Sequence, residues 1–154
     1  MKYTYPLAQW ALAFLLVALG GGAGAQLPDT VEQGKPAVVL VGSYRATDSP
    51  RFRYIGTGFV VGDGLRVVTN AHVTAQVDTA TSDGPALVVQ VRTGPGTWSM
   101  RPAKLLEASP EQDLALLQIA GPTAAALSVA ASEQVREGDD LAFMGFPIGG
   151  LLGF

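Results

Sequence analysis

The sequence predicts an all-β domain folded as one small closed antiparallel barrel. Short apolar runs alternate with clusters of turn-forming residues after residue 36, which is the pattern of β-sandwiches and barrels. No stretch keeps a helical period long enough to predict a long helix. Closing six or seven short strands into a barrel would remove exposed sheet edges. The predicted strands are residues 37–42, 52–61, 65–69, 86–93, 98–106, 113–119 and 140–145.

Residues 1–25 predict a signal peptide rather than part of the barrel. Lys2 gives a positive start, the apolar run 7–19 is interrupted only by Gln9, and Ala23 and Ala25 occupy the positions that signal peptidase prefers. The alternatives are an uncleaved membrane anchor or a buried helix. The run is shorter than the roughly 20 residues that a spanning helix needs. We therefore expect an exported protein, periplasmic or extracellular, with no membrane span after cleavage.

Composition excludes several classes of function. Loss of Lys2 with the signal peptide would change the formal net charge from −3 to −4, which gives no support for nucleic-acid binding. The chain has no cysteine, so it has no disulfide framework and no thiol nucleophile, and a bacterial source is favoured. One histidine without cysteine leaves too few preferred ligands for zinc. We expect neither metal nor cofactor.

The segments between the predicted strands contain residues typical of loops and tight turns. Residues 26–36 predict a lead-in linker, and residues 78–85 a polar loop. Residues 62–64, Gly-Asp-Gly, separate two apolar runs, and Asp-Gly tolerates the positive φ angles of a tight hairpin. Residues 94–96, Gly-Pro-Gly, and the Gly-Pro pair 121–122 break the chain again.

The sole histidine, His72, lies where a β-branched strand ends. Thr69 and Asn70 follow that strand and are plausible N-caps for one helical turn carrying His72. A stiff strand on one side suits a general base, whose effectiveness depends first on geometry. The alternative is a histidine packed at a strand end with its ring bonded to the backbone.

Asp113 stands where an acidic, proline-containing loop meets a strand rich in leucine. Apolar neighbours can draw its carboxylate inward, so it is the candidate acid. The alternative is a solvated aspartate that closes the loop, as Glu111 is expected to be.

Three segments in order resemble trypsin-like serine peptidases, in particular the HtrA (Deg) type of bacterial envelopes. The Gly-Thr-Gly-Phe-Val-Val segment at 56–61 and Val-Thr-Asn-Ala-His-Val at 68–73 are similar to the catalytic-histidine region. Asp-Leu-Ala-Leu-Leu at 113–117 is similar to the aspartate segment. Residues 138–147 resemble the last strand of the first barrel and the Gly-x-Pro turn that follows it.

The resemblance implies a fold of two antiparallel barrels with the active site between them. His72 would take the proton from a serine, and Asp113 would orient the imidazole and stabilise the imidazolium. Residues 37–145 would be the first six-stranded barrel, and residues 146–154 would begin the crossover to a second barrel. The substrates would be proteins or peptides, expected to be unfolded, whose peptide bonds are hydrolysed.

The serine that the family uses lies in a Gly-x-Ser-Gly-Gly motif of the second barrel. None of the serines of this chain has those glycine neighbours: Ser43, Ser49, Ser82, Ser99, Ser109, Ser128 and Ser132. The sequence is therefore expected to be the N-terminal part of a serine endopeptidase, inactive as it stands. Two alternatives remain, a non-catalytic β-barrel binding or pseudo-peptidase module and an unrelated β-barrel in which His72 and Asp113 are structural.

Overall fold

A computed structural model describes residues 26–77, 83–123, 125–131, 133 and 135–146. The predicted signal peptide, residues 1–25, lies outside these residues. The described elements are the helices α2 (Gln26–Gly34), η1 (Lys35–Ala37) and α3 (Ala71–Thr74), and the strands β1 (Val38–Tyr44), β2 (Phe52–Val61), β3 (Arg66–Thr69), β4 (Ala86–Gly94), β5 (Thr97–Ser109) and β6 (Leu114–Ile119).

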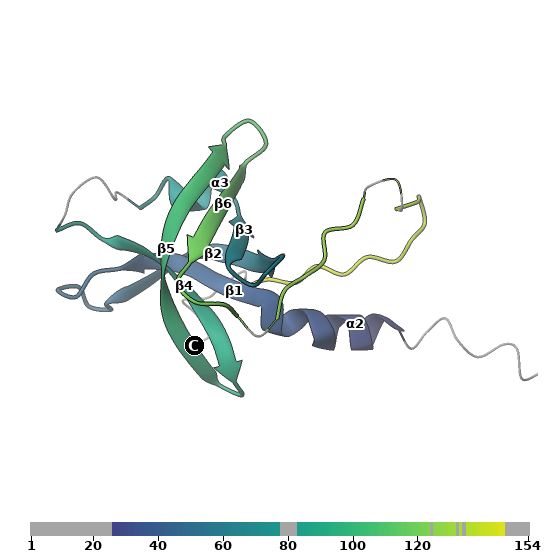
Figure 1. Ribbon diagram of the computed structural model, residues 1–154, viewed down its shortest axis with the longest axis horizontal. Helices are drawn as coiled ribbons and strands as arrows, with labels where there is room; N and C mark the ends of the chain where they lie inside the picture. The colour runs from purple at the N-terminus through teal and green to yellow at the C-terminus, as the bar shows by residue number, and fades with distance from the viewer. Residues whose placement is uncertain (1–25, 78–82, 124, 132, 134, 147–154) are drawn as a thin grey trace, which may run out of the picture.

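The six strands form a closed antiparallel barrel in the order β1-β2-β3-β6-β5-β4 (Figure 1). β1 closes it because it pairs with β2 on one edge and with β4 on the other. The core is made of β-branched and leucine side chains that alternate inward along the strands. The largest fully buried side chains are Leu117, Val39, Val41, Val60, Val67 and Val89. The predicted all-β barrel is confirmed.

The strand predicted at residues 140–145 is wrong. This segment belongs to no helix or strand of the described chain. The physical reason is that every strand of the closed barrel already has two neighbours, apart from the second half of β5, and the end of this segment is held instead by Thr57 and Tyr54 of β2 through Phe146. An alternating apolar pattern predicts a strand without showing whether a partner is available.

The lead-in predicted at residues 26–36 contains a helix that the sequence analysis missed. α2 has nine residues, too few for an isolated helix to be stable in water. Its end packs on the C-terminal segment, because a Cβ placed on Gly34 would lie 2.4 Å from Met144 Cε. Tertiary contact therefore contributes to the stability of this short helix.

The turn predicted at residues 62–64 is confirmed. Gly62 and Gly64 have φ angles of 65° and 81°, which side chains rarely adopt. Asp63 Oδ1 accepts a hydrogen bond of 3.0 Å from the Leu65 N–H, so the aspartate stabilises the turn between β2 and β3.

The C-terminal segment returns to the barrel at Phe146 after a long excursion to one side (Figure 1). The Phe146 N–H donates to Thr57 Oγ1 at 2.8 Å, and the Tyr54 hydroxyl donates to the Phe146 carbonyl. Trp98 meets the Phe146 ring edge-on, with the ring centroids 5.7 Å apart. β2 and β5 thus fix where the chain leaves the barrel.

Close packing at Gly56 joins β2 to the helix that carries His72. A Cβ at Gly56 would lie 2.5 Å from Val73 Cγ2, and Val73 is only 2% exposed. Gly56→Ala should therefore lower the free energy of unfolding by about 1–3 kcal/mol, the usual cost of overpacking. Urea denaturation measures this. The control Gly94→Ala should change little, since its nearest neighbour would be 3.9 Å away. Equal effects of the two substitutions would contradict this account.

Candidate active site

His72 lies in α3, the short helix that follows β3. Its neighbours Ala71 and Val73 are buried and fix the turn against the barrel, whereas the His72 side chain is 64% exposed. Asn70 occupies the N-cap position, as predicted, but its side chain makes no capping hydrogen bond to the helix. Rigid packing of the turn therefore presents an accessible imidazole.

Asp113 ends the loop between β5 and β6. Its φ of 52° places it in the left-handed region, which aspartate and asparagine tolerate better than other non-glycine residues. The Asp113 N–H donates to the Pro110 carbonyl at 3.2 Å and closes the loop. This conformation turns the carboxylate toward α3 instead of into the barrel.

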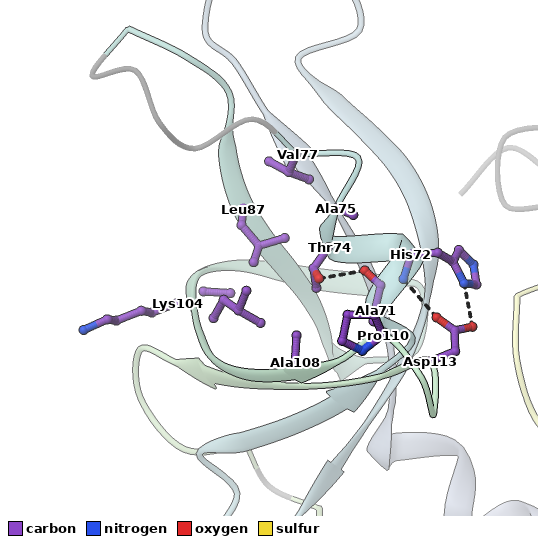
Figure 2. Close-up of a pocket in the computed structure, with 12 residues that line it drawn as sticks. Ala71, His72, Thr74, Ala75, Val77, Leu87, Lys104, Ala108, Pro110 and Asp113 are labelled. Carbon is purple, nitrogen blue, oxygen red and sulfur yellow. Dashed lines mark hydrogen bonds and ion pairs between the residues drawn. The ribbon is translucent and has the colours of Figure 1, made fainter.

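The structure brings the two predicted residues into direct contact (Figure 2). His72 Nδ1 lies 2.7 Å from Asp113 Oδ2, and the His72 backbone N–H donates to Asp113 Oδ1 at 3.0 Å. One carboxylate thus holds both the ring and the backbone of the histidine. Its position also satisfies a free N–H in the first turn of α3, the role that the Asn70 side chain leaves unfilled.

Asn70 is the residue of this site whose role the sequence analysis missed. Its Nδ2 donates to Asp113 Oδ2 and to the Asp113 carbonyl, both at 3.1 Å. Asn70 therefore fixes the carboxylate from the side opposite to the loop. Asn70 precedes His72 by two residues, and from this position the sequence predicts only a helix cap.

Hydrogen bonding stabilises the ionised form of Asp113. The His72 backbone N–H is the largest cause that lowers the pKa of this carboxyl below its ordinary value of 3.8, and the hydrogen bond to the ring adds to it. Charge on Asp113 favours a proton on His72 Nδ1, which leaves Nε2 as the basic nitrogen. Within the part of the chain that the structure describes, Nε2 has no hydrogen-bond partner.

Glu111, two residues earlier in the same loop, is exposed and takes no part in this contact. It forms no ion pair with any described residue. The difference between the two acids matches the distinction expected from the sequence.

His72 and Asp113 lie at one end of a groove of about 680 Å³, and Lys104 lies toward the other end (Figure 2). The remaining lining is almost wholly apolar: Ala71, Thr74, Ala75, Val77, Leu87, Ala103, Leu105, Ala108 and Pro110.

Two searches of the described residues gave negative results. No group of three or more histidine, cysteine, aspartate or glutamate side chains there is placed to hold a metal ion. Across the same ranges, no helix has both the length and the apolar character required to cross a membrane.

A family model of the trypsin-like peptidase domain matches residues 56–153, which include both segments of the site. The chain belongs to the trypsin-like peptidase domain family. The resemblance found in the sequence motifs is confirmed. Within this trypsin-like peptidase domain, the contacting pair comes from β3–α3 and the β5–β6 loop, both on one barrel.

The curated relatives are probable periplasmic serine endoproteases, DegP-like. Those of Brucella suis and Brucella abortus are each 38% identical to this trypsin-like peptidase domain over 96 residues. The match covers 61% of this chain and 17% of each relative, so the chain spans less than a fifth of their length.

Solved structures of HtrA and Deg proteins share the fold. Deg5 matches with a TM-score of 0.55 at 23% identity, covering 77% of this chain and 55% of Deg5. The HtrA-type protease AlgW, solved with a tripeptide, matches with a TM-score of 0.52 at 26% identity, covering 73% of this chain and 32% of AlgW. The barrel is therefore of the HtrA type.

The lowered pKa of Asp113 predicts a pH dependence of stability. Because the pKa is lower in the folded than in the unfolded state, the stabilisation is present above about pH 4 and is lost as the pH falls through the folded-state value. We expect the wild type to be more stable than Asp113→Asn at pH 6, with the gap narrowing below pH about 4. Urea denaturation at both pH values measures it. A gap that stays constant with pH would contradict the prediction.

Proposed function

We propose that this chain is the histidine- and aspartate-bearing part of an exported serine endopeptidase that hydrolyses peptide bonds with a Ser-His-Asp triad. The observation that carries the proposal is the hydrogen bond of 2.7 Å between His72 Nδ1 and Asp113 Oδ2. In a triad, this bond fixes the tautomer whose other nitrogen can accept the proton of a serine hydroxyl.

In the proposed reaction, His72 Nε2 removes the proton of the attacking serine hydroxyl and later gives it to the leaving amine. Asp113 stays ionised and stabilises the imidazolium that forms between these steps. Asn70 holds the Asp113 carboxylate through its Nδ2. Each of the three groups thus has one task, and none of them can supply the nucleophile.

The nucleophile and its oxyanion hole belong, in this proposal, to a second barrel. An apolar row on the outer face of the barrel supports such a partner. Phe59, Val68 and Leu116 are register neighbours on β2, β3 and β6, and Phe59 is 38% exposed. Residues 37–145 would form the first barrel, and residues 146–154 would begin the crossover from the anchor at Phe146.

The proposed substrates are proteins or peptides in unfolded form, and the proposed location is the bacterial periplasm or the exterior. The name of the DegP-like relatives, probable periplasmic serine endoprotease, supports protein substrates and the periplasm. Residues 1–25 would be removed on export, so N-terminal sequencing of exported material should find Gln26 first. A product that retains Met1 would contradict this part.

Two measurements test the function. The chain as it stands should neither hydrolyse casein nor be labelled by a fluorophosphonate probe, because its serines lack the Gly-x-Ser-Gly-Gly setting. The complete gene product should do both and should encode that motif downstream. A complete gene product without the motif would overturn the enzyme proposal.

A second candidate is a non-catalytic barrel that binds a partner. Asp113 accepts the His72 backbone N–H at 3.0 Å, a contact that would fix α3 in such a barrel without any catalysis. This candidate predicts no fluorophosphonate labelling of the complete gene product, with His72 and Asp113 serving only to fix α3.

A further inference from the structure

The second half of β5 has a strand neighbour on one edge only. β4 pairs with β5 from the Gly94↔Thr97 pair as far as Val88↔Pro102. Beyond Ala103, residues 104–109 pair with β6 alone, and no strand among the described residues lies on the other edge. The barrel is therefore closed along β4 and the first half of β5, and open along the rest of β5.

The backbone groups on that open edge can be identified. The Ile119 N–H donates to the Leu65 carbonyl on the side away from β5, so the Ala103↔Ile119 pair is not hydrogen-bonded. In such a pair the N–H and C=O of each residue point away from its partner. Pro102 has no N–H, so its pairing with Val88 depends on the flanking residues, and the Ala103 N–H donates to the Leu87 carbonyl of β4. Leu105, two residues on, points its N–H and C=O to the edge that β4 no longer reaches.

The side chains beside this edge form the apolar groove that ends at His72. Leu105 pairs with Leu117, and register partners share a face of the sheet. Leu117 is fully buried, yet Leu105 is 43% exposed, because no strand covers the inner face at this point. Leu87 and Val77 form the facing wall (Figure 2).

We propose that an extended, apolar segment of a polypeptide substrate adds as a strand to the open edge of β5 and places its side chains in this groove. The inference rests on the proposed function for the identity of the bound chain as substrate. A free backbone N–H and C=O at Leu105, beside an apolar groove, are matched by another extended backbone, which is the chemistry of strand addition. A small apolar molecule would leave them unsatisfied.

The open edge of β5 borders the same groove as the catalytic pair. His72 and Asp113 line the same groove as Ala103 and Leu105. A segment held along β5 would run toward the imidazole, so that residues remote from the cleaved bond contribute to binding. An open apolar edge without such an occupant would favour aggregation.

Binding is tested with a peptide and the full chain Met1–Phe154, without any catalytic step. The probe is acetyl-Val-Leu-Val-Ile-Lys-amide with fluorescein on the lysine, and fluorescence anisotropy measures its dissociation constant. The control peptide has the same sequence with N-methyl groups on alternate residues. We expect saturable binding of the first peptide. The dissociation constant of the second should be at least about ten-fold higher, the effect of losing about two hydrogen bonds.

A matched pair of variants locates the site on the protein. Leu105 and Leu106 are adjacent and similarly exposed, at 43% and 41%, but only Leu105 lines the groove. Leu105→Asn should weaken binding by about ten-fold, in line with the loss of a partly buried leucine contact. Leu106→Asn should leave the dissociation constant unchanged.

Three results would overturn the proposal: no saturable binding, equal binding of the N-methylated peptide, or equal effects of the two variants. A second copy of the chain on this edge is a further outcome that would overturn it. It would appear as a dimer in sedimentation velocity that Leu105→Asn dissociates and the peptide does not. This experiment measures no turnover, so a negative result would contradict peptide binding at β5 without affecting the proposed catalytic role of His72 and Asp113. If that catalytic role were contradicted, the binding measurement would still test the edge of β5.

Discussion

His72→Ala in the complete gene product should lower kcat for casein by about 10⁶-fold, the size of the loss when the base of a serine-peptidase triad is removed. No other histidine exists in this chain to replace it. The free energy of unfolding should change little, because the imidazole is 64% exposed and α3 is held by buried neighbours. Steady-state turnover and urea denaturation of the same preparations measure both.

A loss of turnover in proportion to a loss of folded protein would make His72 a structural residue. Turnover within about ten-fold of the wild type would exclude it as the general base, since base catalysis contributes at least about 10²-fold.

Asp113→Asn should lower kcat by up to about 10⁴-fold and keep the fold. Asparagine accepts the left-handed φ of 52° as readily as aspartate does, so the loop should not rearrange. Its oxygen can still accept the His72 backbone N–H. What is lost is the charge that holds the proton on Nδ1, and the imidazole can then take the wrong tautomer. Active-site titration with a fluorophosphonate, together with kcat, measures the effect.

Glu111→Gln is the matched control. It removes a carboxylate from the same loop, two residues away, where the side chain is exposed and makes no contact with His72. Its kcat should stay close to that of the wild type. If Glu111→Gln were the damaging change and Asp113→Asn the harmless one, the assignment of the acid would be wrong.

The barrel could be predicted from sequence because its physical causes are local. Alternating apolar residues place side chains such as Val39, Val41, Val60 and Val67 inward, and glycine-containing turns separate the strands. The strand at 140–145 failed for a non-local reason, since its apolar pattern carries no information about whether a neighbouring edge is free.

The same contrast applies to the site. His72 and Asp113 could be singled out from their motifs, and the structure brings them into contact across 41 residues of sequence. The part played by Asn70 could not be predicted, because it depends on the loop conformation at Asp113. The open edge of β5 could not be predicted either, because it arises where β4 stops pairing at Pro102. Helix α2 has only nine residues, and its end packs against Met144, a contact that the sequence alone does not reveal.

The contact between His72 and Asp113 has a consequence for the order of events during synthesis. Every group that orients the imidazole, from Asn70 to Asp113, is encoded before residue 114 and lies on one barrel. In a two-barrel enzyme, the residues that form the base and its carboxylate would therefore be synthesised before the serine. Under the proposed function, activity would begin only when the serine-bearing part of the polypeptide docks, so the division of the triad between barrels would leave the first barrel inactive by itself.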